Sequence, residues 1–179
     1  MSHIDSASGF RLMALSYKVR DALKPRLPFL EEAGVREGMT VLDFGCGPGS
    51  YVVPAARMAG NTGVVYALDV QPVALAVSRD RAARAGLANV RTILSDCDTG
   101  LPGNSVDIAL LYDIYHGLAY PTTILTELHR VLRPSGILSS HDHHLKGPVL
   151  KQSIESSGLF RMQRIGALTL SFAPERKDT

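Results

Sequence analysis

The stretch Val41-Leu42-Asp43-Phe44-Gly45-Cys46-Gly47-Pro48-Gly49-Ser50 decides the fold. Residues 41–44 form a short apolar strand, and Gly then occupies every second position of a tight turn before a helical segment over residues 51–59. Glycine removes the Cβ atom where the backbone passes close to a neighbour, and the first amides of a helix face the same space. A strand, a turn and a helix in this order are typical of an α/β protein that binds a nucleotide-like ligand.

The composition fits a single soluble globular domain. The chain has 179 residues, of which 45% are hydrophobic and 20% charged, and its net charge is +2. This length allows a full hydrophobic core, and the dispersed basic residues give no signal for nucleic acid. No apolar run approaches the roughly 18 residues of a membrane span, and residues 2–8 are too polar for a cleavable signal. Cys46 and Cys97 lack the spacing of a disulfide framework or zinc site, so we expect a cytoplasmic protein.

Strands and helices alternate from residue 40 onward. Strands are predicted at 41–44, 64–70, 90–94, 106–112 and 137–141, and helices at 51–59 and 72–85 and from residue 122 to a stop-and-turn signal at 133–136. A helix over 148–157 is followed by strands at 159–164 and 168–172, which should form an antiparallel hairpin around Gly166. The pattern predicts a doubly wound α/β sheet, mostly parallel, with an antiparallel C-terminal edge.

The N-terminal part of the chain predicts a helical cap. Residues 10–24 show apolar side chains at helical spacing, Pro25 and Pro28 end this element, and a short helix over 29–33 is closed by Gly34. The first helix could be a lid whose Tyr17 touches the ligand, or simply a helix docked on the core. We expect residues 1–38 to form this cap and residues 39–179 to form the ligand-binding domain, as one globular unit.

Carboxylates at successive strand ends point to an adenosine group. Asp69 ends the second predicted strand, where it could accept hydrogen bonds from both ribose hydroxyls or cap the helix that starts at Pro72. Asp96 follows the third strand, where it could accept from an adenine amino group while the Cys97 amide faces the ring. Alternatively, Asp96 and its neighbour Asp98 could be loop residues that make Asx-turns.

These motifs, together with Arg130-Val131-Leu132-Arg133-Pro134-Ser135-Gly136, resemble class I S-adenosylmethionine-dependent methyltransferases, in particular the small-molecule subgroup typified by ubiquinone/menaquinone biosynthesis methyltransferases. The similarity covers residues 35–140 in order and spacing. It implies a Rossmann-like seven-stranded sheet of order 3-2-1-4-5-7-6 and S-adenosyl-L-methionine as cofactor, with Asp43 and the glycine loop at the methionine moiety, Asp69 at the ribose, and Asp96 and Cys97 at the adenine. The cofactor-binding residues predicted are Asp43, Gly45, Cys46, Gly47, Gly49, Asp69, Val70, Asp96, Cys97 and Tyr112, with Tyr17 from the cap.

The methyl acceptor should bind at the end of the fourth predicted strand. This strand runs into Tyr112-Asp113-Ile114-Tyr115-His116, at the point where the donor methyl group should project. His116 has the acid–base range of a general base, and Tyr115 could line the acceptor pocket, so these two are the predicted catalytic residues. The alternative is that both are loop residues packed on the following helix.

A histidine cluster ends the fifth predicted strand. Alternation places His141 and His143 on one side and Asp142 and His144 on the other. His141 and His143 could contact substrate, and a His/Asp cluster could also ligate a metal ion. No fourth ligand is evident in the sequence and methyl transfer needs no metal, so we predict no metal site.

The sequence thus favours a methyltransferase that acts on a small molecule by in-line displacement. Two rivals are a nucleotide-dependent oxidoreductase, disfavoured because Ser50 replaces the third glycine of its motif, and a non-catalytic protein that binds S-adenosylmethionine. A nucleic-acid or protein methyltransferase is a third, and the Asn-Pro-Pro-Tyr motif of base-modifying enzymes is absent after the fourth strand. A second subunit could complete the pocket, so a homodimer stays open. The acceptor and the attacked atom are not specified.

Overall fold

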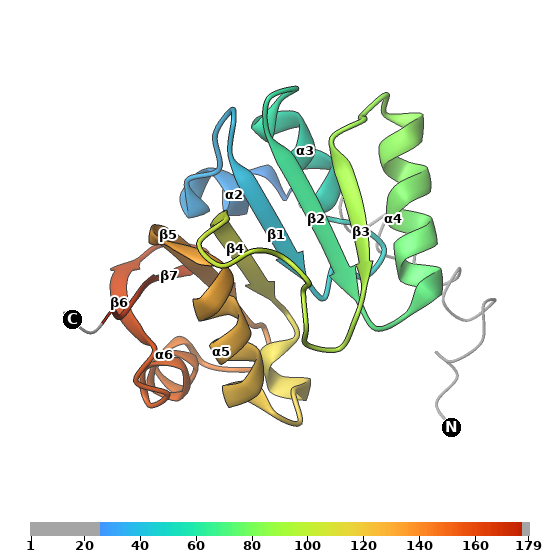
Figure 1. Cartoon of the computed structure of the whole chain (residues 1–179). Coiled ribbons are helices and arrows are strands. Elements are labelled where there is room, and N and C mark those ends of the chain that lie inside the picture. The colour runs from blue at the N-terminus through green and yellow to red at the C-terminus, as the bar shows by residue number, and fades with distance from the viewer. Residues whose placement is uncertain (1–25, 177–179) are drawn as a thin grey trace.

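The computed structural model describes residues 26–176 as one seven-stranded sheet with helices on both faces (Figure 1). Its strands are β1 (Thr40–Phe44), β2 (Val64–Asp69), β3 (Val90–Leu94), β4 (Val106–Tyr112), β5 (Leu132–His141), β6 (Phe160–Ile165) and β7 (Leu170–Pro174). Its helices are α2 (Leu27–Ala33), α3 (Val52–Ala59), α4 (Pro72–Arg84), the 3₁₀ turn η1 (Tyr115–Gly117), α5 (Pro121–Val131) and α6 (Gly147–Glu155). The predicted helix at 10–24, with Tyr17, lies outside the described residues. Within residues 26–176, no helix has the length and apolar character needed to cross a membrane.

The strand order confirms the predicted topology. The order is β3-β2-β1-β4-β5-β7-β6, with parallel pairing from β3 to β5 and antiparallel pairing of β7 with both β5 and β6. The chain moves outward in one direction from β1 to β3 and then crosses to β4 on the other side of β1. Such a switch point leaves a crevice at the carboxyl ends of the two central strands, where open α/β sheets bind their ligands.

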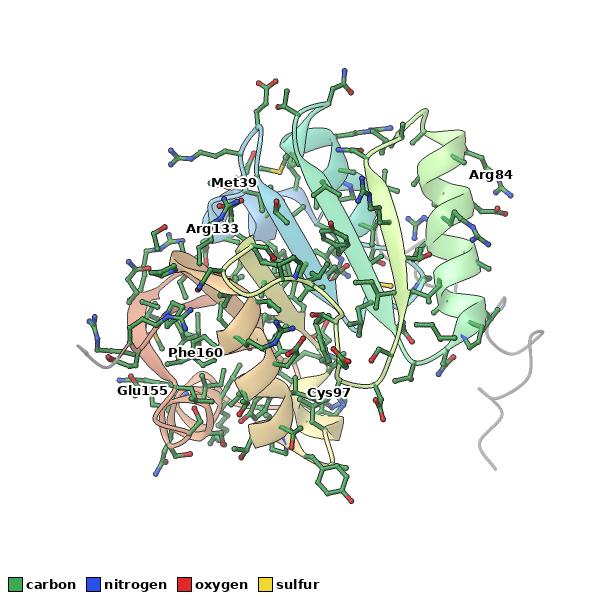
Figure 2. All side chains as sticks on the ribbon, in the orientation of Figure 1. Met39, Arg84, Cys97, Arg133, Glu155 and Phe160 are labelled. Carbon is green, nitrogen blue, oxygen red and sulfur yellow. The ribbon has the colours of Figure 1, made fainter. Side chains whose placement is uncertain are left out.

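Two hydrophobic layers follow from the alternation of side chains along the central strands. Val41 faces the layer built with α2, α3 and part of α4, whereas Leu42 faces the layer built with α5 and α6. Phe160 lies fully buried in the second layer, and Arg84 lies on the outer surface of α4 (Figure 2). The sheet is therefore covered on both faces, as its near-continuous apolar strands require.

Strand β5 begins earlier than the sequence pattern predicts. The predicted turn at residues 133–136 lies inside this strand as an irregularity, because Leu132 pairs with Val106 and the next pairing joins Ile137 to Ile108. Leu132 is fully buried, and its packing extends β5 to the residue before the predicted turn. At the other end, β7 starts at Leu170, and Leu168 lies partly exposed in the preceding turn. Pro28 does not end a helix but sits in the first turn of α2.

The carboxylate of Glu32 fastens the β6–β7 turn to helix α2. It accepts hydrogen bonds from the backbone amides of Ala167, Leu168 and Thr169, at 2.7–3.2 Å, and from the Thr169 hydroxyl at 2.8 Å. Partial burial alone would raise the pKa of Glu32, but these hydrogen bonds outweigh it and hold the pKa below its ordinary value. This contact joins the two ends of the described chain.

Glu32→Gln should lower the free energy of unfolding near neutral pH by about 1–2 kcal/mol, because hydrogen bonds to a charged, partly exposed acceptor are lost. Since the folded-state pKa is below the ordinary value of 4.5, the contribution of Glu32 is present above that pH and is lost as the pH falls through the folded-state pKa. Urea titrations at several pH values measure both effects. Glu31→Gln, on the exposed side of the same helix, is the control; equal losses in the two variants would contradict the prediction.

Candidate functional site

A cavity of about 720 Å³ opens at the carboxyl ends of the central strands, beside the switch point. This volume is within the range of small-molecule and cofactor sites. The predicted residues that line it are Asp43, Gly45, Cys46, Gly47, Asp69, Val70, Asp96, Cys97, Tyr112 and His116. Gly49 and Tyr115 are not part of the wall, and Tyr17 lies outside the described residues. Four strand ends that are distant in sequence thus contribute to one cavity.

The three glycines of the loop after β1 serve different purposes. All three have positive φ, at +78° for Gly45, +51° for Gly47 and +80° for Gly49, which side chains rarely adopt. A Cβ at Gly45 would lie 2.7 Å from Ile114 Cδ1, and one at Gly49 would lie 3.1 Å from the Ser78 Cα of helix α4. A Cβ at Gly47 would meet nothing within 4 Å. Gly45 and Gly49 therefore allow close packing, whereas Gly47 leaves its backbone open to the cavity.

Backbone hydrogen bonds hold this loop in place. The amides of Gly45 and Cys46 both donate to the carbonyl of Leu68, at 2.8 and 2.9 Å, and the Gly47 amide donates to Asp69 Oδ2 at 2.8 Å. Asp69 Oδ1 accepts from the amide of Gln71, immediately before helix α4, at 2.9 Å. Asp69 therefore organises the turn into α4, as one of the two sequence interpretations expected, and also lies in the cavity wall, as the other requires.

Asp96 and Cys97 lie at the end of the cavity beyond β3. The Cys97 amide donates to the Ser95 hydroxyl at 3.2 Å, so the amide expected to face an adenine ring is engaged within its own loop. Both cysteines are free thiols, Cys46 buried and Cys97 half-buried. The roles of Asp96 and Cys97 toward the adenine remain predictions.

Among the aspartates of residues 26–176 that line the cavity, only Asp43 is buried. It is 2% exposed, and its Oδ2 has no hydrogen-bond partner among the described residues. Burial, with a further contribution from the charge of Asp69, raises the pKa of Asp43 to about 7. An unpartnered buried oxygen that faces a cavity fits a cationic ligand group, because a cation would restore the ionised form. The ammonium group of S-adenosylmethionine is such a group.

The other half of the cavity is built by the segment that follows β4. Ile114, the short stretch 117–120, and Thr123 and Ile124 of helix α5 give it a mainly apolar wall, into which His116 is set. Tyr115, in contrast, is 7% exposed and belongs to the hydrophobic layer under α5 and α6. This placement corresponds to the packing role that the sequence left open for Tyr115, and it does not support a catalytic role.

Asp142 holds His116 and is a functional candidate that the sequence reasoning did not select. Its Oδ2 lies 2.9 Å from His116 Nδ1 and accepts from the His116 amide at 3.0 Å, while its Oδ1 accepts from the His144 amide at 2.9 Å. Burial alone would raise the pKa of Asp142, but the hydrogen bonds from His116 and His144 outweigh it and lower the pKa. The His-Asp-His-His run was the available signal, but it did not indicate that Asp142 faces residue 116.

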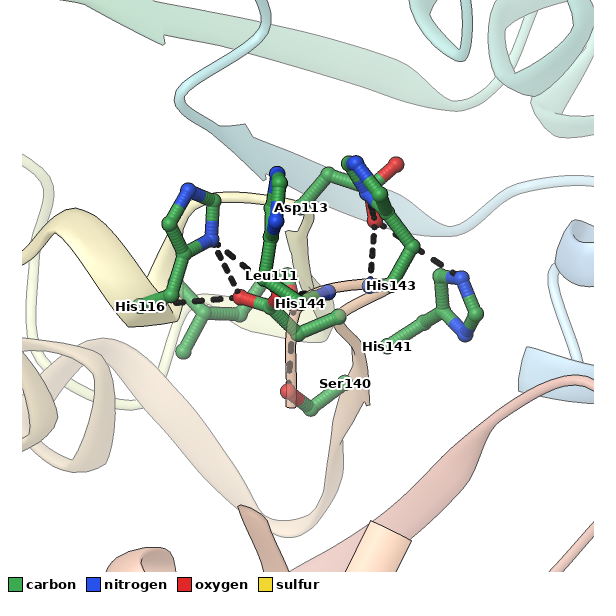
Figure 3. A network of polar contacts seen from close by, with 8 residues as sticks. Leu111, Asp113, His116, Ser140, His141, His143 and His144 are labelled. Carbon is green, nitrogen blue, oxygen red and sulfur yellow. Dashed lines mark hydrogen bonds and ion pairs between the residues drawn. The ribbon is translucent and has the colours of Figure 1, made fainter. Parts of the chain in front are cut away.

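A second carboxylate, Asp113, holds the other end of the histidine cluster. Its Oδ1 lies 2.9 Å from His143 Nδ1 and 3.6 Å from His141 Nε2, so both histidines reach Asp113 (Figure 3). The predicted placement of His144 on the opposite side is wrong, because β5 ends at His141 and the rings of His143 and His144 pack with centroids 3.9 Å apart. Asp113 has φ +57°, a conformation uncommon for a non-glycine residue. Ligand atoms of Asp113, Asp142 and His143 lie within 4.8 Å of one another and could hold a metal ion. Both carboxylates are already engaged by histidines, so the absence of a metal site stays our prediction.

The fold and the cavity define a doubly wound α/β protein that binds a nucleoside-like cofactor at its switch point. The chain belongs to the methyltransferase domain family, whose model matches residues 35–168, and its cofactor is S-adenosyl-L-methionine. It is 29% identical to an S-adenosylmethionine-dependent methyltransferase of Aquifex aeolicus of known structure, with a TM-score of 0.74 over 90% of this chain and 97% of that one.

Two curated relatives are also similar. The nocamycin O-methyltransferase of Saccharothrix syringae is 31% identical over 78% of this chain and 48% of its own length. The demethylmenaquinone methyltransferase of Geobacillus stearothermophilus is 31% identical over 66% of this chain and 51% of its own length. The chain thus spans about half the length of these relatives. The resemblance to small-molecule methyltransferases of the quinone type is confirmed, and the oxidoreductase alternative finds no support.

Asp43→Asn should stabilise the protein at alkaline pH. Because the pKa of Asp43 is raised from 3.8 to about 7, the wild type loses stability as the pH rises through this interval, and the Asn variant does not. We expect the variant to exceed the wild type by about 2–4 kcal/mol at about pH 8 and the gap to shrink toward about pH 4. Denaturant titrations across this range measure it, with the exposed Asp80→Asn as control. A gap independent of pH would contradict the assignment.

Proposed function

We propose that this protein transfers the methyl group of S-adenosylmethionine to a small organic molecule bound beside His116. The observation that carries the proposal is the cavity itself. It brings together a buried carboxylate with an unpartnered oxygen, at the end of β1, and a histidine in an apolar wall that follows the neighbouring strand β4. The names of the two curated relatives, which specify nocamycin and demethylmenaquinone, support a small organic acceptor.

The cofactor would lie along the carboxyl ends of β1, β2 and β3. Asp43 would hold its ammonium group, Asp69 its ribose hydroxyls, and the loop 95–97 its adenine. S-adenosylmethionine supplies an electrophilic methyl group on a positively charged sulfur. Gly47, where no side chain intervenes, lets the backbone approach the cofactor closely.

The charge of the cavity wall argues for a neutral acceptor. Asp43, Asp69, Asp96 and Asp113 contribute carboxyl groups, and no lysine or arginine of residues 26–176 lines the cavity. An anionic acceptor such as a carboxylate or a phosphate ester would be repelled by this wall. The apolar surface of Ile114 and Ile124 suits instead the body of a hydrocarbon or aromatic molecule. We infer an uncharged acceptor with a hydroxyl group, which also disfavours nucleic acid.

His116 would accept the proton of the acceptor hydroxyl. As this proton moves to the imidazole, the acceptor oxygen forms its bond to the methyl carbon, and the carbon–sulfur bond breaks with its electrons going to sulfur. The products are a methyl ether, S-adenosylhomocysteine and a protonated His116, so charge and atoms balance. Holding the two reacting atoms about 3–3.5 Å apart and in line supplies most of the remaining catalysis.

We further propose the organisation and setting of the protein. Residues 1–38 would cap the cavity, with Tyr17 close to the cofactor, and residues 39–179 would form the catalytic domain. The two free thiols suit a reducing cytoplasm. A homodimer in which a second chain covers the apolar half of the cavity is the proposed alternative to closure by the cap alone.

Calorimetry with S-adenosylhomocysteine and with NADH tests the cofactor assignment. We expect binding of S-adenosylhomocysteine alone, and Asp69→Asn should weaken it about 10- to 100-fold, because hydrogen bonds to a charged acceptor are lost. Asp80→Asn on the outer face of α4 is the matched control. Binding of NADH in preference to S-adenosylhomocysteine, or equal affinity in the Asp69 variant with an unchanged melting temperature, would contradict the proposal.

Turnover with a panel of hydroquinones, phenols and benzoic acids tests the acceptor assignment. We expect release of S-adenosylhomocysteine with the neutral hydroxyl compounds and little with the acids. His116→Gln should lower kcat about 100-fold or more, because general-base assistance is lost, with the dissociation constant for S-adenosylhomocysteine unchanged. His129→Gln, which alters a half-buried histidine outside the cavity wall whose Nε2 contacts the Glu175 carbonyl, should leave kcat unchanged. Preferred methylation of the acids would contradict the inference that the acidic cavity wall favours an uncharged acceptor.

A further inference from the structure

We propose that Asp142 is the positioning residue for His116: it keeps the proton on Nδ1 and turns the bare Nε2 toward the methyl acceptor. The inference concerns the geometry of one side-chain pair, and its catalytic meaning rests on the proposed function.

The hydrogen-bond inventory of Asp142 determines which imidazole nitrogen carries the proton. An ionised carboxylate can only accept, and the side chain of Asp142 is fully buried. Both of its oxygens lie near His116 Nδ1, at 2.9 and 3.1 Å, so this nitrogen must be the donor. In a neutral imidazole with its proton on Nδ1, the lone pair is on Nε2. The side chain of His116 is 35% exposed and forms part of the cavity wall, so this lone pair is accessible.

Further contacts restrain His116 and its ring. The His116 amide donates to Asp142 Oδ2 at 3.0 Å, so backbone and ring are held by the same carboxylate. The ring of His144 packs on that of His116 with centroids 4.2 Å apart, and the ring of His143 packs on His144 at 3.9 Å (Figure 3). The three imidazoles thus lie in a row with their planes tilted by 50° and 42°, and a carboxylate stands at each end, Asp142 at His116 and Asp113 at His143.

The position of Asp142 in the fold explains why it can hold His116 rigidly. Asp142 follows directly after β5, and β5 pairs with β4. The Asp113 amide donates to the His141 carbonyl at 2.8 Å, which extends the pairing of these two strands by one step. The loops after β4 and β5 are therefore tied together by backbone and by side chains. A base built on two joined strand ends loses less entropy when the acceptor binds than one on a free loop.

Imidazole nitrogen spectra of ¹⁵N-labelled protein with S-adenosylhomocysteine bound test the proposal without any acceptor. Loss of one signal set from the six histidines in His116→Gln identifies the signals of His116. In the wild type, at a pH where this ring is neutral, we expect a protonated Nδ1 and a bare Nε2. Asp142→Asn should convert this pattern to a mixture of the two tautomers. Asp113→Asn removes the equivalent partner of His143 and should change His143 while leaving His116 as it is.

A wild-type His116 protonated on Nε2, or an unchanged tautomer in Asp142→Asn, would overturn the proposal. The wild-type spectrum decides even if the variant does not fold. Failure of every acceptor in the turnover panel would count against the proposed function and leave this spectroscopic result standing.

Turnover in a double-mutant cycle separates positioning from a merely structural role. With a hydroquinone that the wild type methylates, Asp142→Asn should lower kcat about 10- to 100-fold and leave the affinity for S-adenosylhomocysteine unchanged. In the His116→Gln background the same substitution should cause no further loss, because Asp142 acts through His116. An equal loss in both backgrounds, or a fall in melting temperature and cofactor affinity parallel to kcat, would show that Asp142 only supports the fold.

Discussion

The hydrogen bond from the Gly47 amide to Asp69 Oδ2 is the constraint on which the cofactor site depends. It joins the end of β2 to the turn that leaves β1, and the other oxygen of Asp69 holds the entry to α4. The loop is thereby formed before any ligand arrives, with its middle glycine open to the cavity and its outer glycines packed on Ile114 and Ser78. Preorganisation of this kind reduces the ordering that binding would otherwise require.

The sequence predicted the sheet well because each central strand is a short apolar run that ends in glycine, aspartate or a turn. It predicted the start of β5 less well. The residues at 133–136 favour a turn, but in the structure they form an irregularity inside β5, because the buried Leu132 already pairs with β4. Local turn preference and tertiary packing both act there, and periodicity detects only the first.

The cofactor half of the site was predictable since its residues follow strands whose order the motifs imply. The acceptor half was less predictable, because it depends on contacts between side chains of the loops that follow β4 and β5. Tyr115 and His116 are neighbours in sequence, yet one packs under α5 and α6 and the other faces the cavity. Both residues belong to the 3₁₀ turn at residues 115–117, which points their side chains in different directions. These directions cannot be predicted from strand or helix periodicity. Asp142 was visible only as a member of a polar cluster.

The acidic wall of the cavity has a consequence for the order of events after methyl transfer. Asp43, Asp69 and Asp96 line the cavity proposed here for a molecule that arrives with a positive sulfur and leaves without one. In that arrangement, the Coulomb attraction between the wall and the sulfonium disappears at the moment of reaction. The spent cofactor would therefore be held less firmly than the fresh one.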